Sequence, residues 1–188
     1  PQPEIDVTYH QVIGDEFASP TVHGIPQAAV YALSADRYPY WSEYLNYKAD
    51  FGLLGENLTV DILREEDFFI HDEWEVGTTL LKVTGPRYPC TRLNYVSGKK
   101  EMRDEFAEKA WPGVYFEVLR EGAIKPGDEL VLKKRVQEDV TVKDLFLSMR
   151  DVERREPIND RVRKVLKLEG LFSRYRSRVA NFYEETKV

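Results

Sequence analysis

Apolar residues in the first 136 positions occur in short runs separated by glycine and proline, a pattern typical of many short strands. Strands are expected at 28–33, 58–60, 78–84, 114–119 and 129–133. The Gly and Pro pairs between these runs predict turns. Short strands with frequent turns favour a sandwich or barrel over a doubly wound parallel sheet.

Two stretches in the same region break the strand pattern. Residues 34–48 are rich in aromatic side chains and residues 99–109 are rich in charged ones. Both are expected to be helical. The first unit is therefore predicted to be mainly β with some α.

After Arg135, apolar residues recur every three or four positions, which is the spacing of an amphipathic helix. Thr141 followed by Asp144 predicts a helix N-cap, Pro157 interrupts the pattern, and Gly170 separates the second helical stretch from the third. Three short amphipathic helices in about 50 residues form a plausible small bundle. We therefore expect two units, residues 1–136 and residues 137–188.

Composition narrows the class of protein. The chain has 188 residues, 42% of them hydrophobic, and a net charge of −6. Residues 1–136 hold 15 basic and 23 acidic side chains, whereas residues 137–188 hold 12 and 10. This balance argues against nucleic-acid binding, and the lack of a long apolar run argues against a membrane span. The N-terminal stretch does not look like a signal peptide, so a cytoplasmic location is expected.

Only a few side chains offer redox or nucleophilic chemistry. Cys90 is the single cysteine, which excludes an intramolecular disulfide and fits a reducing compartment. Three histidines are too scattered to predict a zinc site from spacing. The chemistry must therefore use one thiol, one or two imidazoles, or an imported cofactor.

The segment that ends at Cys90 is the most informative. It reads Gly-Pro-Arg-Tyr-Pro-Cys over residues 85–90 and comes directly after an expected strand. Two prolines stiffen the turn, and Arg87 is close enough in the chain to favour a thiolate. A thiolate is a soft metal ligand or a nucleophile. On this segment alone, a buried hydrophobic role for Cys90 is an equal alternative.

Two further motifs hold polar groups beside glycine. His23-Gly24 could present an imidazole at the edge of a strand or loop, although a structural histidine is the commoner arrangement. Residues 52–59 place Glu56 and Asn57 beside backbone amides that could hold an oxyanion or the polar ring of a cofactor. A plain turn is the alternative for this second motif.

Taken in order, these motifs resemble those of MOSC domains, named after the C-terminal part of molybdenum-cofactor sulfurase. The resemblance rests on His23-Gly24, the Phe-Gly-Leu-Leu-Gly-Glu-Asn-Leu-Thr run at 51–59, the Pro-Arg-Tyr-Pro-Cys segment and the turn at 122–128. The helical tail is similar to that of the YiiM-like branch. The resemblance implies a closed β-barrel followed by a small C-terminal three-helix bundle.

The resemblance also implies a cofactor, the molybdenum cofactor (molybdopterin), with Cys90 as the metal ligand. At the family level it further implies pyridoxal phosphate binding and a role in detoxification. Catalytic roles fall on Cys90, His23 and Arg87. Cofactor-binding roles fall on His23, Gly24, Glu56, Asn57, Arg87 and Cys90.

The implied activity is a molybdenum-dependent oxidoreductase that reduces N-hydroxylated compounds such as 6-N-hydroxylaminopurine. Its partners would be a small-molecule substrate and a separate electron-donating reductase, and a homodimer is expected. No ordinary side chain supplies two electrons, which agrees with an imported redox group. Two alternatives stay open: thiol catalysis with Cys90 as nucleophile and His23 as base, and a non-catalytic carrier of cofactor or sulfur that uses Cys90.

Overall fold

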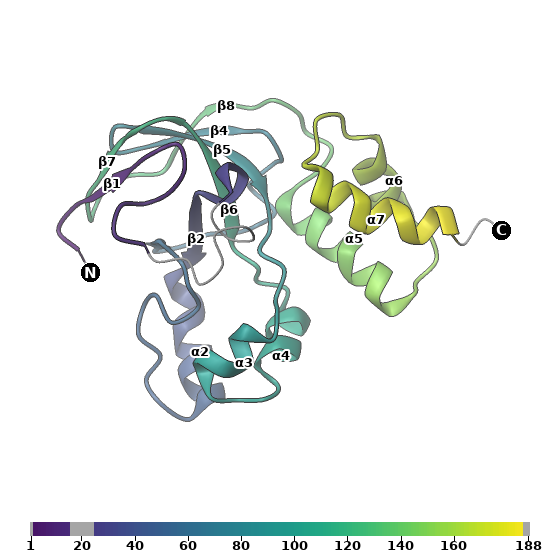
Figure 1. Ribbon diagram of the computed structural model, residues 1–188, viewed down its shortest axis with the longest axis horizontal. Helices are drawn as coiled ribbons and strands as arrows, with labels where there is room; N and C mark the ends of the chain where they lie inside the picture. Colours follow the sequence, from purple (N-terminus) through teal and green to yellow (C-terminus); the bar gives the residue numbers. More distant parts are fainter. Residues whose placement is uncertain (1, 16–24, 186–188) are drawn as a thin grey trace.

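The computed structural model describes residues 2–15 and 25–185 (Figure 1). Its strands are β1 (Ile5–Val7), β2 (Val30–Ser34), β3 (Leu58–Val60), β4 (Glu73–Val76), β5 (Thr79–Gly85), β6 (Val114–Arg120), β7 (Gly122–Ile124) and β8 (Val131–Lys134). Its helices are η1 (Pro26–Ala28), η2 (Ala35–Arg37), α2 (Tyr38–Leu45), α3 (Arg92–Ser97), α4 (Met102–Lys109), α5 (Val142–Arg154), α6 (Asp160–Lys167) and α7 (Ser173–Glu185).

Six strands form one curled sheet in the order β3-β2-β6-β5-β4-β8, and β1 pairs with β7 in a separate two-stranded sheet. Only β2 and β3 run parallel among the described pairs. Among the described strands, β3 and β8 end the ladder without pairing to each other, so the sheet is a curled half-barrel rather than the expected closed barrel. The exposed lysines of β8, Lys133 and Lys134, are the kind of charged edge that resists further pairing.

The five expected strands and both expected internal helices are present, with shifted ends. The pattern missed β1, β4, β7 and the short helix α3. Three of these, β1, β7 and α3, are only three to six residues long, too short for a period to be recognised. Their existence depends on partners elsewhere in the chain.

The three expected C-terminal helices are confirmed as α5, α6 and α7. Thr141 and Asp144 form a reciprocal capping box at the start of α5, where the Thr141 hydroxyl accepts a hydrogen bond from the Asp144 amide at 3.0 Å. Asn159 caps α6, where its side chain accepts a hydrogen bond from the Val162 amide. No helix among the described residues has the length and apolar character needed to cross a membrane.

A shared core joins the sheet to the C-terminal helices. Leu81 and Phe116 of the sheet belong to the same cluster of buried side chains as Leu145, Val165 and Val179 of the helices. A second cluster, built on Trp41 and Phe106 among others, lies under α2, α3 and α4. The division at residue 136 therefore marks a change of secondary structure across continuous packing.

Candidate functional site

The candidate site is the loop at 86–90, between the end of β5 and the start of α3. Gly85, the last residue of β5, pairs with Tyr115 of β6, and the Cys90 carbonyl accepts the Leu93 amide at 3.0 Å as α3 begins. Cys90 itself is exposed. The buried-hydrophobe alternative for this thiol is therefore wrong.

Arg87 turns from this loop toward the segment at 52–59. Its guanidinium donates a hydrogen bond to the Leu54 carbonyl and lies 5.3 Å from the centre of the Tyr31 ring. Gly55 has a left-handed φ of 81°, and a Cβ there would lie 3.0 Å from an Arg87 nitrogen. Glycine at this position thus allows the close approach of the arginine.

Arg87 is a partly buried cation, and none of the described carboxylates forms an ion pair with it. Burial lowers its pKa, but Tyr31, Tyr115 and Cys90 raise it by more, so the pKa lies above the usual arginine value. The guanidinium therefore keeps its charge. An unpaired guanidinium beside an exposed thiol is a suitable place for an anion.

Two tyrosines complete this neighbourhood, and neither was singled out in the sequence. Tyr31 and Tyr115 face each other across β2 and β6, with ring centroids 4.9 Å apart. Burial raises the pKa of both phenols, while Arg87 lowers it, and the net shift is upward. Both hydroxyls thus keep their protons at neutral pH. That Tyr31 and Tyr115 stand opposite each other depends on the register between β2 and β6, which the sequence pattern does not reveal.

Glu56 lies behind the loop at 52–59 rather than on open surface. It is 8% exposed, and its Oε1 accepts hydrogen bonds from the Gly52 amide at 2.8 Å and the Thr59 hydroxyl at 3.2 Å, as well as from the Tyr38 hydroxyl. Its Oε2 is buried without a hydrogen-bond partner among the described residues. In this arrangement Glu56 shapes the loop, and direct contact with a ligand stays a prediction.

Asn57 joins the loop to β2. Its Oδ1 accepts the Tyr31 amide at 2.9 Å, and its Nδ2 donates to the Asp15 carboxylate at 2.8 Å. Asn57 and Arg87 therefore meet around Tyr31, one at its backbone and the other at its ring. His23 and Gly24 lie outside the described residues, so their predicted roles are untested.

The backbone amides of this loop bond within the chain. Besides the Gly52 amide, the Leu53 amide donates to Asp50 and the Gly55 amide donates to Gly52. The oxyanion cradle expected from these amides is therefore not formed by these three groups. The Arg87 guanidinium is a cationic donor that lies against this loop.

A shallow hollow of about 380 Å³ begins one residue beyond Cys90. It is lined by Thr91, Asn94, Tyr95, Gly98 and Lys100 on and beside α3. None of the predicted site residues lines it. Among the described residues, no group of three or more His, Cys, Asp or Glu side chains could hold a metal ion.

The family is shown by a match between residues 19–131 and the MOSC domain model, which covers more than half of the chain. The chain belongs to the MOSC domain family, and within it the chain is similar to YiiM and YflK proteins. A Bacillus subtilis (strain 168) protein named YflK is 37% identical over 129 residues, which are 69% of this chain and 58% of that protein. Escherichia coli (strain K12) YiiM is 31% identical over 144 residues, which are 75% of this chain and 64% of that protein.

A longer relative carries a functional name. A Gibberella moniliformis protein named Reductase is 33% identical over 128 residues, which are 66% of this chain but 23% of that protein. The chain therefore spans less than two thirds of the length of each of these three relatives.

Solved structures agree with the fold. YiiM from Escherichia coli has a TM-score of 0.77 at 23% identity, covering 97% of this chain and 86% of that one. YiiM from Geobacillus stearothermophilus has a TM-score of 0.69 at 26% identity, covering 84% and 81%. The sheet and the C-terminal helices together are thus an arrangement that other proteins share.

Proposed function

We propose that this protein is a molybdenum-cofactor-dependent reductase of N-hydroxylated compounds such as 6-N-hydroxylaminopurine, with Cys90 as the metal ligand. The observation that carries the proposal is that the single thiol of the chain is exposed and close in the loop to the Arg87 guanidinium, which has no carboxylate partner among the described residues. A thiolate suits a soft redox metal, and a guanidinium suits phosphate or oxo groups. Membership of the MOSC family supports the same cofactor.

The residues of the site fit such a group. Cys90 would hold the metal, and Arg87 would bind the anionic part, since its charge has no carboxylate among the described residues to neutralise it. When bound, the cofactor would supply the two-electron redox chemistry that side chains lack. His23, Gly24, Glu56 and Asn57 are retained as proposed cofactor contacts, and His23 as a proposed catalytic residue.

The side chains of the protein would orient the reacting group and donate protons to it. Reduction of an N-hydroxyl group breaks the N–O bond, takes up two electrons and two protons, and releases an amine and water. Tyr115 interacts electrostatically with Arg87 and Cys90 and keeps its proton at neutral pH. We assign the Tyr115 Oη as a proton donor to the departing oxygen, with Arg87 orienting the reacting group.

The electrons would come from a separate reductase, because the proposed reaction consumes a pair of electrons in each cycle. The relative named Reductase supports an oxidoreductase. A cytoplasmic homodimer acting on a small molecule completes the proposal. These features rest on the family resemblance.

The exposed thiol also suits a second function, a non-catalytic carrier that holds the cofactor or a persulfide sulfur on Cys90. A carrier would bind the cofactor or sulfur without turning over substrate, whereas a reductase would turn it over. Thiol catalysis without a metal would turn over substrate even when the cofactor is absent.

The experiment expresses the protein in hosts that can and cannot make the molybdenum cofactor, then measures bound molybdenum and turnover of 6-N-hydroxylaminopurine with a competent reductase. The reductase function predicts metal and turnover from the first host only. Metal without turnover would support the carrier, and equal turnover from both hosts would support thiol catalysis.

A further inference from the structure

We propose that the C-terminal helices α5 and α7 position the loop at 86–90, with Tyr88 and Tyr175 as its two anchors and Glu153 as the carboxylate that holds the first anchor in place. This inference rests on the proposed function only for the roles of Arg87 and Cys90. Two of its three positioning residues, Glu153 and Tyr175, lie outside the MOSC match at 19–131.

Tyr175 of α7 anchors the beginning of the loop. Its hydroxyl donates a hydrogen bond of 2.9 Å to the carbonyl of Pro86, the residue before Arg87. Its ring lies against Gly85, where a Cβ would stand only 2.5 Å from the Tyr175 Cε2. Tyr175 is 8% exposed, so the contact is part of the packed interior. Backbone at Gly85 and Pro86 therefore cannot shift without displacing α7.

Tyr88 anchors the middle of the loop on the same helices. Its ring centroid lies 5.6 Å from that of Phe146, a fully buried residue of α5. The Arg178 guanidinium of α7 lies 3.7 Å from the Tyr88 ring centroid, a cation–π distance. Burial and the nearby Glu153 raise the pKa of Tyr88 to about 12, so the ring stays neutral. Tyr88 thus binds to the helices while its neighbour Arg87 binds to the segment at 52–59.

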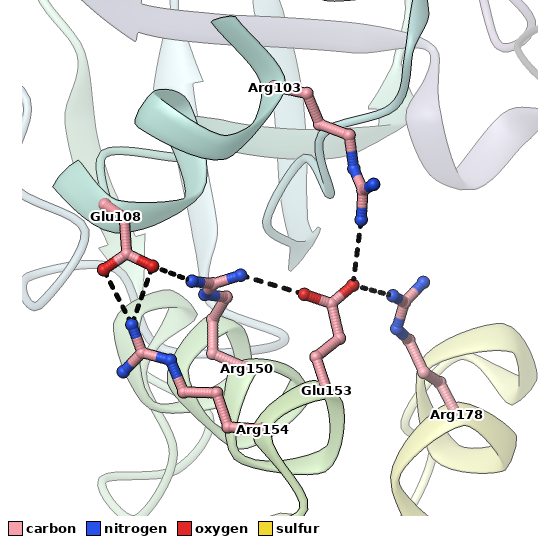
Figure 2. Close-up of polar contacts among 6 residues, drawn as sticks. All are labelled: Arg103, Glu108, Arg150, Glu153, Arg154 and Arg178. Carbon is pink, nitrogen blue, oxygen red and sulfur yellow. Dashed lines mark hydrogen bonds and ion pairs between the residues drawn. The ribbon is translucent and has the colours of Figure 1, made fainter. Parts of the chain in front are cut away.

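Glu153 holds Arg178 over that ring. Figure 2 shows Glu153 between three arginines, and its carboxylate accepts hydrogen bonds from Arg178 at 2.9 Å, Arg150 at 2.9 Å and Arg103 at 3.4 Å. Burial raises its pKa, but Tyr88, Arg178 and Arg150 lower it by more, so the carboxylate is charged. Arg103 belongs to α4, so Glu153 also ties the helices to the first unit of the chain.

The same network continues to Glu108 of α4. Arg154 donates to both Glu108 oxygens at 2.8 and 2.7 Å, and Arg150 also bonds to Glu108 (Figure 2). Two carboxylates and four arginines thereby join α4, α5 and α7 beside the ring of Tyr88. Exposed ion pairs stabilise little singly, but a connected set restricts the geometry of the groups it joins.

The short chain distance from Tyr88 to Cys90 makes this anchor relevant to the thiol. Only Pro89 separates them, and the proline ring removes freedom at φ. A change in how Tyr88 packs against the helices must therefore also shift the backbone at Cys90. A purely stabilising role for α5 and α7 predicts no such local effect.

The test uses the metal-free protein with a nitroxide spin label on Cys90, the only thiol in the chain. Electron paramagnetic resonance line shape reports the mobility of the label, and the rate of Cys90 alkylation by iodoacetamide gives a second readout. The variants are Tyr88→Ala, Tyr88→Phe, Glu153→Gln and the milder Tyr175→Phe, which removes only the bond to Pro86. Asp151→Asn is the matched control, because the Asp151 carboxylate of α5 bonds to Asn159 and Arg161 at the start of α6 and to no described residue of the loop at 86–90.

We expect Tyr88→Ala, Glu153→Gln and Tyr175→Phe to sharpen the spectrum and to change the alkylation rate by about threefold. Tyr88→Phe keeps the ring that contacts Phe146 and Arg178 and removes only the hydroxyl close to Glu153, so it should change the spectrum and the rate less than Tyr88→Ala does. Asp151→Asn should match the parent. Parent-like spectra and rates in Glu153→Gln and Tyr175→Phe would overturn the inference, as would a change in Asp151→Asn equal to theirs.

These measurements are independent of cofactor and turnover. Failure of the proposed function, seen as full turnover without molybdenum, would leave a mobility change in the anchor variants intact. Failure of the positioning role would leave molybdenum-dependent turnover intact. The two results therefore separate the two ideas.

Discussion

The Arg87 guanidinium lies 5.3 Å from the centre of the Tyr31 ring and donates a hydrogen bond to the carbonyl of Leu54. Through this contact a loop residue at the end of β5 reaches β2 and the segment at 52–59. The guanidinium stays charged there without a carboxylate partner among the described residues. An anion bound beside Cys90 would therefore meet a positive charge that the described part of the chain leaves unneutralised.

Replacing Arg87 by alanine should weaken retention of an anionic cofactor more than it weakens folding. A hydrogen bond to a charged group contributes about 1.5–3 kcal/mol, so we expect affinity to fall about tenfold or more. Bound molybdenum and thermal unfolding measure the two effects. Arg163→Ala, on the exposed face of α6, is the charge-matched control. Equal cofactor content in Arg87→Ala and the parent would contradict the assignment.

Replacing Cys90 by serine should leave a folded protein with almost no reductase activity on N-hydroxylated bases. The thiol is exposed, so its packing role is small and the free energy of unfolding should change by less than about 0.5 kcal/mol. A hydroxyl stays protonated at neutral pH and is a poor ligand for a soft metal. The assay requires loaded parent enzyme and a competent reductase, with Thr91→Ser as the neighbouring control. Full activity in Cys90→Ser would refute the metal-ligand and nucleophile roles together.

Removing the hydroxyl of Tyr115 should lower kcat while leaving the fold intact. General acid catalysis contributes about 100-fold or more, and phenylalanine preserves the ring that packs on Tyr31. Steady-state kinetics of Tyr115→Phe would be compared with those of Tyr9→Phe, which changes an exposed tyrosine just after β1. An unchanged kcat would remove Tyr115 from the reaction.

Alanine at Gly85 should destabilise the protein because its Cβ would stand 2.5 Å from the Tyr175 ring. Overpacking of this kind costs about 1–3 kcal/mol. Gly127→Ala is the control, since Gly127 also has a positive φ but has no neighbour within 4 Å of the added Cβ. Chemical denaturation should show a larger loss of unfolding free energy for Gly85→Ala. A loss no larger than that of Gly127→Ala would mean that α7 yields to the added methyl group.

Acid should weaken the ion-pair network through Glu153. Its pKa is lowered in the folded protein, so the folded state binds the proton less tightly than the unfolded state does. The stabilisation is therefore present above the ordinary glutamate pKa of 4.5 and is lost as the pH falls through the lower folded value. The difference in unfolding free energy between the parent and Glu153→Gln should shrink as the pH falls from about 7 through that window. A difference that stays constant with pH would contradict a charged Glu153.

Much of the secondary structure could be predicted because its signals are local. The capping box of Thr141 and Asp144 marks the start of α5 within four residues, and Pro157 and Gly170 lie in the breaks between the C-terminal helices. The alternation in β5 and β6 likewise depends on neighbouring residues. Whether the sheet closes into a barrel could not be predicted from local signals, because closure depends on pairing between two edge strands that are distant in the sequence, β3 and β8.

Some residues of the candidate site could likewise be found from local sequence signals, and others depend on contacts between distant segments. Cys90 and Arg87 were accessible to sequence reasoning because prolines and glycine surround them in one short segment. Tyr115, Tyr175 and Glu153 were not, since each reaches the loop from strands or helices remote in the chain. Glu56 and Asn57 were singled out as polar side chains beside amides that could hold an oxyanion or a cofactor, and the structure bonds both of them to protein groups.

By itself, the sequence determined strands β2, β3, β5, β6 and β8, helices α2 and α4 to α7, their order along the chain, and the presence of one thiol and one arginine in a stiff turn. These features arise from backbone preferences and from spacing along the chain, which act over a few residues. Only the tertiary structure decided that Tyr31 and Tyr115 flank Arg87, and that α5 and α7 hold Tyr88 and the backbone at Gly85. Those contacts depend on strand register and on the packing of side chains from distant segments, and no local pattern encodes either one.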